Sequence, residues 1–384
     1  MEANEMRVVL LAADFPPSVG GIQRYGAGLA GALVQAGVPV QVVAMQQPGC
    51  ERFDAEVGYE VVRVPGGSKR AVWQQMRHAA QSAWPGDDTT AFVALKWFPE
   101  GPAALQAAAA RRGISAMIGH DREFALHGLN AIKWAMQKWV LSACDIPFAT
   151  TAFAASQMER MGVASRRLRR LGTGLDGQQF YPDSEAAQRL RCRLGLEDAT
   201  VVCTVSRLAA HKGHRHVMEA LTLIADRLPR LRYLIIGDGP YRPDLERHAG
   251  ALGASDMVRF TGPVSADDLR AYYTMADVMV MATHDLPGHP TEGFGLSFIE
   301  ANACGTPVIG THTGGIPEAI EDGVSGLLVP PCDPETLAEA LLSLLTASDY
   351  AHLLGEKGRQ RALSQFTWPR VVARLIEALD GAQG

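Results

Sequence analysis

Short apolar runs alternate along the chain with segments of helical periodicity. In the first half, the predicted strands are Arg7–Ala13, Val40–Met45, Phe92–Leu95 and Ile114–Ile118. In the second half, they are Thr200–Val205, Tyr233–Ile236, Val258–Thr261, Val278–Met281, Pro307–Ile309 and Gly326–Val329. Strands that alternate with helices form parallel sheets. The pattern therefore predicts an α/β protein with two such sheets.

The segment between the two halves is rich in turn-forming residues, among them Gly172, Gly174 and Pro182. We therefore expect a hinge at residues 174–184. The chain has 384 residues, which is more than one hydrophobic core usually supports. The predicted domains are residues 1–176 and residues 184–363.

Composition and charge exclude several classes of protein. Apolar residues make up 47% and charged residues 20% of the chain, as in ordinary globular proteins. A net charge of −5 gives no general attraction to nucleic acid. The six cysteines include no Cys-x-x-Cys pair, so they suggest neither a zinc site nor a disulfide framework. We find no signal peptide or spanning segment. We expect a cytoplasmic protein, at most peripheral at the inner face of the cell membrane.

Residues 26–31 and 172–177 match the pattern Gly-x-Gly-x-x-Gly, but neither is predicted to bind a dinucleotide. The fingerprint requires its glycines in a strand-to-helix turn, whereas residues 26–31 lie inside a predicted helix. The second match follows Arg166–Arg170, which is a poor buried strand. We expect the glycines of residues 26–31 to allow close packing of their helix on the sheet.

Two cations follow the first strand of the second half, Arg207 and Lys212. At the carboxyl end of a strand both can face a ligand. An arginine fork together with a lysine point charge suits a diphosphate. The alternative is two ordinary surface cations.

Glycines precede a later helix, and two glutamates lie on either side of its start. Small residues before a helix N-terminus let backbone N–H groups approach an anion. If Glu292 lies in the loop and Glu300 in the helix, both can converge on one ligand. Glu292 would then reach a sugar, and Glu300 a ribose diol. The residues between them that lead into the helix are Gly293, Phe294, Gly295 and Leu296.

Several motifs occur together in an order that resembles glycosyltransferase family 4. They are Phe15-Pro16-Pro17 with Gly20-Gly21-Ile22, Gly174-Leu175-Asp176 with Phe180-Tyr181-Pro182, Ser206-Arg207-Leu208 with Lys212-Gly213, Gly237-Asp238-Gly239-Pro240, Val258–Gly262, the Glu292/Glu300 pair, Gly326–Val329 and Phe366-Thr367-Trp368. The resemblance covers nearly the whole chain. Within this family, the chain resembles bacterial hexosyl- and mannosyltransferases, such as the phosphatidylinositol mannosyltransferases.

This resemblance implies the GT-B fold, in which two Rossmann-like domains face each other across a cleft. A C-terminal helix, residues 366–380, would pack back on the first domain. The implied reaction moves a hexosyl unit from a UDP- or GDP-hexose to an alcohol of a lipid, glycan or small molecule, with retention. The leaving phosphate would take the acceptor proton. No cofactor or metal is expected, because the chain contains no Asp-x-Asp.

The resemblance also assigns roles to residues. His120 follows a predicted strand and would contact the donor sugar, with Asp14 and Arg122 as weaker neighbours. The expected catalytic residues are His120, Glu292, Arg207 and Lys212. The expected donor-binding residues are Gly20, Gly21, Arg207, Lys212, Gly237, Glu292, Gly293, Phe294, Gly295, Leu296 and Glu300. One departure is the linker Leu171-Gly172-Thr173-Gly174, where the family commonly has Pro-Asn-Gly; it alters a turn.

The sequence indicates less clearly which residues bind the acceptor. Lys69–Trp84 reads as a helix with one apolar face and several cations. It either packs on the domain core, which we favour, or lies at a membrane interface. Arg166–Arg170 is either a solvated face or a contact for an anionic surface. Two other functions stay open: a nucleotide-sugar 2-epimerase of the same fold, and a non-catalytic protein that binds sugar nucleotides.

Overall fold

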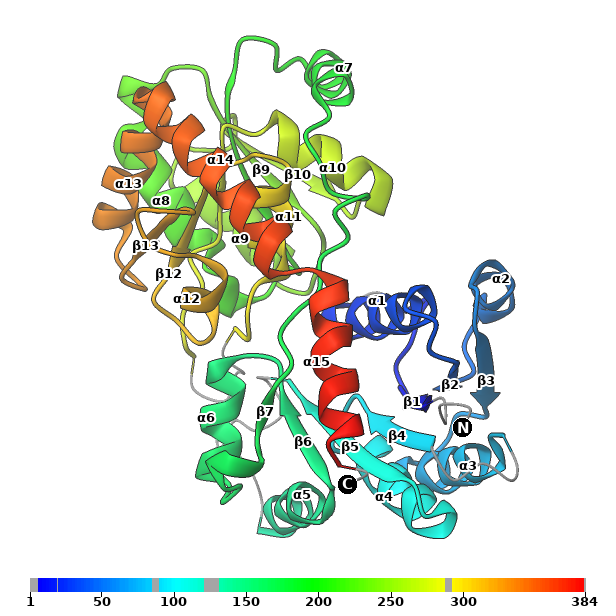
Figure 1. Cartoon of the computed structure of the whole chain (residues 1–384). Helices are drawn as coiled ribbons and strands as arrows, with labels where there is room; N and C mark the ends of the chain where they lie inside the picture. The colour runs from blue at the N-terminus through cyan, green and yellow to red at the C-terminus, as the bar shows by residue number, and fades with distance from the viewer. Residues whose placement is uncertain (1–5, 19, 85–89, 121–130, 287–291, 383–384) are drawn as a thin grey trace. The chain divides into compact units, whose positions relative to one another are not determined.

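The structure is a computed structural model that describes residues 6–18, 20–84, 90–120, 131–286 and 292–382. Contacts within the chain divide it into two compact units. The first comprises Met1–Gly174 and Thr367–Gly384, and the second comprises Leu175–Phe366. Each unit is built around one parallel sheet with helices packed on it (Figure 1).

The first unit contains a seven-stranded sheet in the order β3-β2-β1-β4-β5-β6-β7. Its strands are β1 (Arg7–Leu11), β2 (Val40–Met45), β3 (Glu60–Val64), β4 (Thr90–Ala94), β5 (Ile114–Gly119), β6 (Ile146–Ala149) and β7 (Arg169–Arg170). The sequence predicted β1, β2, β4 and β5, whose near-continuous apolar runs suit strands buried on both faces. It missed β3 and β6. The arginine run contributes only β7, an exposed strand of two residues.

Helices cover both faces of this sheet. Alternate residues of β1 belong to two hydrophobic clusters, because successive side chains of a strand point to opposite faces. The helices of this unit are α1 (Gly21–Gln35), α2 (Cys50–Glu56), α3 (Lys69–Ser82), α4 (Glu100–Arg111), α5 (Ala131–Ala143), α6 (Ala152–Arg160) and α15 (Trp368–Asp380). Helices α1 and α15 share the cluster on one face, and α3, α4, α5 and α6 contribute to the other.

The last helix of the chain, α15, belongs to the first unit, beside α1 (Figure 1). Val371, Val372, Leu375 and Leu379 are buried, and their helical spacing forms one apolar face. The indole of Trp368 lies where side chains at Gly28 and Gly174 would be. Gly26, against Leu95 and Phe15, and Gly28, against another helix rather than the sheet, therefore serve close packing, whereas Gly31 does not.

We expect Gly28→Ala and Gly31→Ala to change stability in opposite directions. A methyl group at Gly28 would overlap the Trp368 indole, whereas one at Gly31 meets nothing within 4 Å. Overpacking costs ~1–3 kcal/mol, whereas alanine in an open helical position stabilises by ~0.5–1 kcal/mol. Thermal unfolding of both variants checks this, with Gly31→Ala as the matched control. Equal melting temperatures would contradict the packing argument.

The second unit contains a six-stranded parallel sheet in the order β10-β9-β8-β11-β12-β13. All six strands were predicted from the sequence. They are β8 (Thr200–Val205), β9 (Leu231–Ile236), β10 (Val258–Gly262), β11 (Val278–Val280), β12 (Val308–Thr311) and β13 (Leu327–Val329). The order reverses between β8 and β11, and in open α/β sheets such a reversal opens a crevice at the carboxyl ends of the strands.

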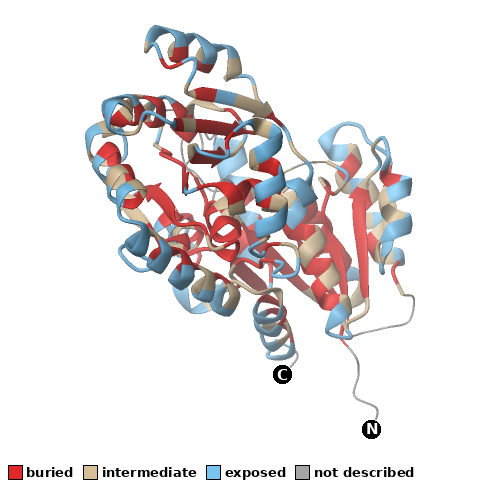
Figure 2. Cartoon of the chain, turned by 90° about the horizontal axis from the view of Figure 1, so that it is seen from above, coloured by how far each residue is buried: buried red, intermediate tan, exposed pale blue. Residues whose placement is uncertain are grey.

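Helices also cover both faces of the second sheet. They are α7 (Ser184–Leu194), α8 (His214–Ile224), α9 (Arg242–Ala251), α10 (Ala266–Met275), α11 (Leu296–Ala303), α12 (Ile316–Ala319), α13 (Pro334–Thr346) and α14 (Ser348–Gln365). One cluster packs α7, α10, α11 and α12 on the sheet, and the other packs α8, α9 and α13. Figure 2 shows that most strands are buried, whereas the helices expose their outer faces to solvent. Within the described residues, no helix is long and apolar enough to cross a membrane.

Candidate active site

The loops that follow β8 and β11 bring an ion pair together in the second unit. Lys212 ends a 3-10 turn, Ala210–Lys212, and forms a salt bridge with Glu292 in the loop before α11. Both side chains are buried. Gly213 has a left-handed φ of 72°, and a side chain there would overlap the carbonyl of Ala282. This close approach holds the loop after β8 against the end of β11.

Arg207 lies two residues after the end of β8 and is exposed, in contrast to Lys212. The sequence grouped the two cations as one diphosphate clamp. The structure places them on the same connection, but Lys212 is already paired with Glu292. An incoming phosphate would therefore share Lys212 with this carboxylate, whereas Arg207 is open to solvent.

Glu300 lies within α11 and has a different partner. The hydroxyl of Tyr273, on α10, donates a hydrogen bond of 2.8 Å to Glu300 Oε2, and both residues are buried. Glu292 lies in the loop before the helix, which is the arrangement required for both glutamates to reach one ligand. Tyr273 was missed by the sequence analysis, because nothing in its spacing indicates which residue faces Glu300.

The glycines before α11 shape its N-terminus. Gly295 has a φ of 82°, and a side chain there would meet the ring of Phe298. The residue before α11 is Gly295, which has no side chain to cap the helix, so no side chain at that position accepts hydrogen bonds from the N–H groups of the first turn. The side chain of Phe294 is buried, 5.3 Å from Phe366 between ring centroids. Phe294 and its neighbours Gly293 and Leu296 can therefore offer a ligand backbone atoms, while the Phe294 ring belongs to the core.

Gly237 follows β9 in a conformation that favours glycine, with a φ of 127°. A side chain there would overlap the carbonyl of Ser206, next to Arg207. Its N–H donates a hydrogen bond of 2.9 Å to the carbonyl of Gly262. Gly237 thus lets two loops pack closely at the carboxyl edge of the sheet. Contact between Gly237 and the nucleotide-sugar donor stays a prediction.

In the first unit, His120 lies at the carboxyl end of β5. Its ring packs edge-on against Tyr25, with centroids 5.0 Å apart. Burial and the nearby charge of Lys96 lower the pKa of His120 to about 3, so the imidazole is neutral at working pH. Its Nε2 atom is buried and has no hydrogen-bond partner among the described residues. Asp121 and Arg122, its neighbours in the sequence, lie outside the described residues.

Charged residues also gather where the order of this sheet reverses, between β1 and β4. Asp14, which follows β1, forms a salt bridge with Lys96, which follows β4. Glu100 is fully buried, and its Oε1 accepts a hydrogen bond of 2.9 Å from the N–H of Ala13. Lys96 and Glu100 were missed, although Lys96 follows an apolar run just as Arg207 does. The same rule about strand ends would have found it.

We expect Glu100→Gln to remove a pH dependence of stability. Burial raises the pKa of Glu100 from 4.5 to about 7, so the folded state favours the protonated acid. Stability of the wild type should fall as pH rises from about 4.5 to about 7, by about 3 kcal/mol if the full difference is realised. Glutamine keeps the shape and does not titrate. Urea unfolding at pH 4.5 and 7.5 checks this; parallel losses in both proteins would contradict it.

The remaining predicted glycines lie at the start of α1. Gly20 precedes the helix in an extended conformation, and Gly21 is its first residue and exposed. No side chain caps this helix of 15 residues, and its first turn contains no acidic residue. Such an N-terminus can accept an anion.

The helix expected at Lys69–Trp84 is α3, and its apolar face packs on the core. Val72, Met76 and Ala80 are buried in the cluster beneath it. A depression of about 380 Å³ lies between the middle turns of α3 and the end of β3. The more exposed apolar side chains lie instead on α5, at Ile132, Trp134 and Trp139. Apolar residues occur on both the buried and the exposed sides of α5, so periodicity did not single out this face.

Two family models match the chain, one in each of its two units. The profile of Glycosyltransferase Family 4 matches residues 19–179, and that of Glycosyl transferases group 1 matches residues 188–361. A GDP-mannose-dependent alpha-(1-6)-phosphatidylinositol monomannoside mannosyltransferase from Mycolicibacterium smegmatis is 33% identical, over 97% of this chain and 98% of its own length. A D-inositol 3-phosphate glycosyltransferase from Geodermatophilus obscurus is 34% identical, over 64% of this chain and 54% of its own length.

Solved structures resemble the chain over almost its full length. Anabaena HepE in complex with UDP and glucose has a TM-score of 0.84 at 18% identity, covering 98% of this chain and all of its own. Sucrose-phosphate synthase from Thermosynechococcus elongatus has a TM-score of 0.81 at 23% identity, covering 98% of each chain. These similarities show the GT-B fold. The protein is a glycosyltransferase. More narrowly, the chain belongs to glycosyltransferase family 4.

Proposed function

We propose that the chain transfers a mannosyl unit from GDP-mannose to an inositol-bearing lipid, with retention at the anomeric carbon. The observation that carries this is the full-length similarity to GDP-mannose-dependent phosphatidylinositol monomannoside mannosyltransferases. None of the relatives named above is an epimerase. A buried ion pair contributes little stability of its own, so the Lys212–Glu292 pair supports a functional site at this position, and the transfer assay below distinguishes catalysis from binding alone.

In this proposal the diphosphate binds at the reversal of the second sheet. Arg207 and Lys212 neutralise the leaving group, and the N-terminus of α11 adds backbone donors. Glu292 fixes Lys212 and accepts hydrogen bonds from sugar hydroxyls. Glu300, oriented by Tyr273, holds the ribose diol. Gly21 at the start of α1 offers a second anion-binding terminus, on the first unit.

The transfer proceeds by attack on the face that the diphosphate leaves. The acceptor oxygen bonds to the anomeric carbon, the bond from that carbon to the β-phosphate oxygen breaks, and the acceptor proton moves to the departing phosphate. A double displacement would need a free carboxylate beside the anomeric carbon. Glu292 is engaged by Lys212, which makes it a poor nucleophile. The neutral imidazole of His120 can hydrogen-bond a sugar hydroxyl through Nε2.

We expect transfer to survive removal of divalent metal. Arg207 and Lys212 supply the positive charge that a metal would otherwise bring to the diphosphate, and the chain contains no Asp-x-Asp. The measurement is the initial rate with and without excess chelator at fixed ionic strength. A complete loss that magnesium or manganese restores would contradict this expectation.

The test of the proposed function combines two donors with two acceptors. The purified chain is incubated with GDP-mannose or UDP-glucose, and with vesicles containing a phosphatidylinositol mannoside or with soluble inositol 3-phosphate. We expect transfer from GDP-mannose to the lipid, with an α-linkage by NMR. The soluble acceptor is the second candidate, because the inositol phosphate glycosyltransferase is equally similar over part of the chain. Activity with UDP-glucose alone, or an inverted linkage, would refute the proposal.

We also propose that α5 contacts the membrane that carries the acceptor. Ile132, Trp134 and Trp139 expose 73%, 38% and 49% of their surface. Lys138 lies 5.0 Å from the centroid of the Trp134 ring. Exposed tryptophans next to lysines are typical of helices that lie in a membrane interface.

A further inference from the structure

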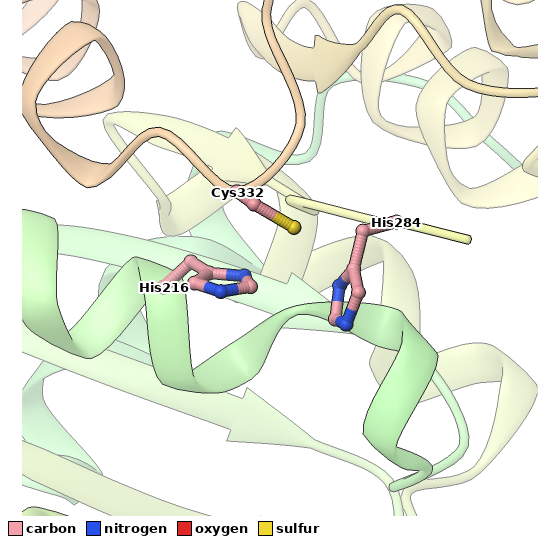
Figure 3. A group of neighbouring side chains, drawn as sticks. All are labelled: His216, His284 and Cys332. Atoms are coloured by element: carbon pink, nitrogen blue, oxygen red, sulfur yellow. The ribbon is translucent and has the colours of Figure 1, made fainter. Parts of the chain in front are cut away.

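Three side chains with metal-binding atoms converge near the carboxyl edge of the second sheet (Figure 3). His216 comes from the first turns of α8, His284 from the loop after β11, and Cys332 from the turn between β13 and α13. Their ligand atoms all lie within 4.8 Å of one another. These residues take no part in the proposed transfer, and nothing in the sequence pattern pointed to them, because they are far apart in the chain.

The two histidines leave buried polar atoms unsatisfied. The Nδ1 atoms of His216 and His284 are both buried without a hydrogen-bond partner among the described residues. Their rings meet edge-on, with centroids 4.8 Å apart. A neutral imidazole carries a lone pair on one ring nitrogen, which is the atom that binds a metal ion. An unpaired buried nitrogen costs free energy, which a bound cation would offset.

Cys332 has an unusual backbone conformation. Its φ of 59° lies in the left-handed region, where glycine is the default residue. A cysteine there is strained relative to glycine, and such outliers are found preferentially at functional positions. The thiol lies at the exposed side of the cluster, where solvent and a metal ion can reach it.

We propose that His216, His284 and Cys332 form a binding site for a transition metal of the zinc class. Zinc takes two imidazoles and a thiolate at about 2.0–2.3 Å, which sets neighbouring ligands about 3.3–3.8 Å apart. Small side-chain rotations, chiefly of the exposed Cys332, bring the cluster to that spacing. A water molecule completes the tetrahedron. Magnesium and calcium prefer oxygen ligands and do not suit this set.

A metal here would link three segments that surround the proposed donor site. The N–H of His284 donates a hydrogen bond of 3.0 Å to the carbonyl of His211, next to Lys212. His216 belongs to the helix that begins just after Lys212. The bound ion therefore stabilises the connections after β8, β11 and β13 without touching the reacting atoms. The site is independent of which sugar the enzyme transfers.

The test uses the full chain, stripped of metal under reducing conditions. Zinc is titrated in competition with a chromophoric chelator, and cobalt is added separately as a spectroscopic probe. We expect one zinc ion per chain, a thiolate-to-cobalt charge-transfer band, and a higher melting temperature with zinc. His216→Ala and Cys332→Ser should lose this saturable binding. Cys192→Ser and His352→Ala, which alter an exposed cysteine and an exposed histidine elsewhere, should keep it.

Cys332→Gly separates metal binding from folding. Glycine relieves the left-handed backbone, so this variant should melt at or above the temperature of the metal-free wild type, yet show no shift with zinc. Zinc binding that persists in Cys332→Gly would overturn the proposal. So would a cobalt spectrum without the thiolate band, or the absence of stoichiometric binding in the wild type.

Discussion

Lys212→Ala is expected to lower kcat by about 10²–10³-fold, the usual effect of removing one donor that stabilises developing negative charge. The side chain lies at the reversal of the second sheet, where the leaving diphosphate is proposed to bind. Arg207→Ala should give a loss of similar size, and Arg207→Lys a smaller one, because lysine keeps the charge but not the fork. Steady-state rates with saturating donor measure these effects.

Lys212→Ala also leaves Glu292 buried without its partner, which alone can destabilise a protein. The double variant Lys212→Met/Glu292→Gln removes both charges and should fold better than the single variant while remaining inactive. Arg230→Ala, which breaks an exposed ion pair with Asp198, is the matched control for loss of a cation. Near-normal turnover in both Lys212→Ala and Arg207→Ala would refute the diphosphate clamp.

Much of the fold could be predicted because parallel strands are buried on both faces. Such strands appear as continuous apolar runs, and all six strands of the second sheet were found this way. β3 was missed because its residues are only partly buried and include Glu60 and Arg63. β6 is a run of four residues containing Pro147, too short for a periodic signal.

The contacts of the candidate site were harder to predict than its members. Motif order singled out Lys212 and Glu292, but their mutual salt bridge depends on the register of two loops 80 residues apart. Tyr273 and the His216, His284 and Cys332 cluster are defined by three-dimensional proximity alone. The sequence rule for zinc looks for cysteines close together in the chain, so it cannot indicate a cluster whose three residues come from separate segments.

The exposed apolar face of α5, where we propose membrane contact, also could not be predicted from the sequence. Periodicity identified α3 as amphipathic, and the structure buries its apolar face in the core. Whether an apolar residue faces the core or solvent depends on what packs beside it. Only the structure showed that Trp134 and Trp139 remain exposed among the described residues.

Trp134→Ser/Trp139→Ser is therefore expected to weaken binding to anionic vesicles by roughly a hundredfold. Burying the two side chains in the interface contributes about 3 kcal/mol, and each 1.4 kcal/mol corresponds to about tenfold in affinity. Both side chains project from the outer side of α5, whose Val140 and Leu141 anchor the helix in the core. The substitutions should therefore leave the fold intact. Co-sedimentation with vesicles of increasing phosphatidylinositol content measures the effect.

A control variant distinguishes this face from exposed apolar surface in general. Leu223 is 58% exposed on α8, in the second unit, and Leu223→Ser should leave vesicle binding unchanged. The tryptophan pair should also leave transfer to a short-chain, soluble acceptor unchanged, because α5 is proposed to bind the membrane and not the sugar. Loss of transfer to lipid in vesicles with full transfer to the soluble acceptor would support the interfacial role. Equal vesicle binding by the wild type and the tryptophan variant would exclude it, because the apolar contribution of α5 would then be absent.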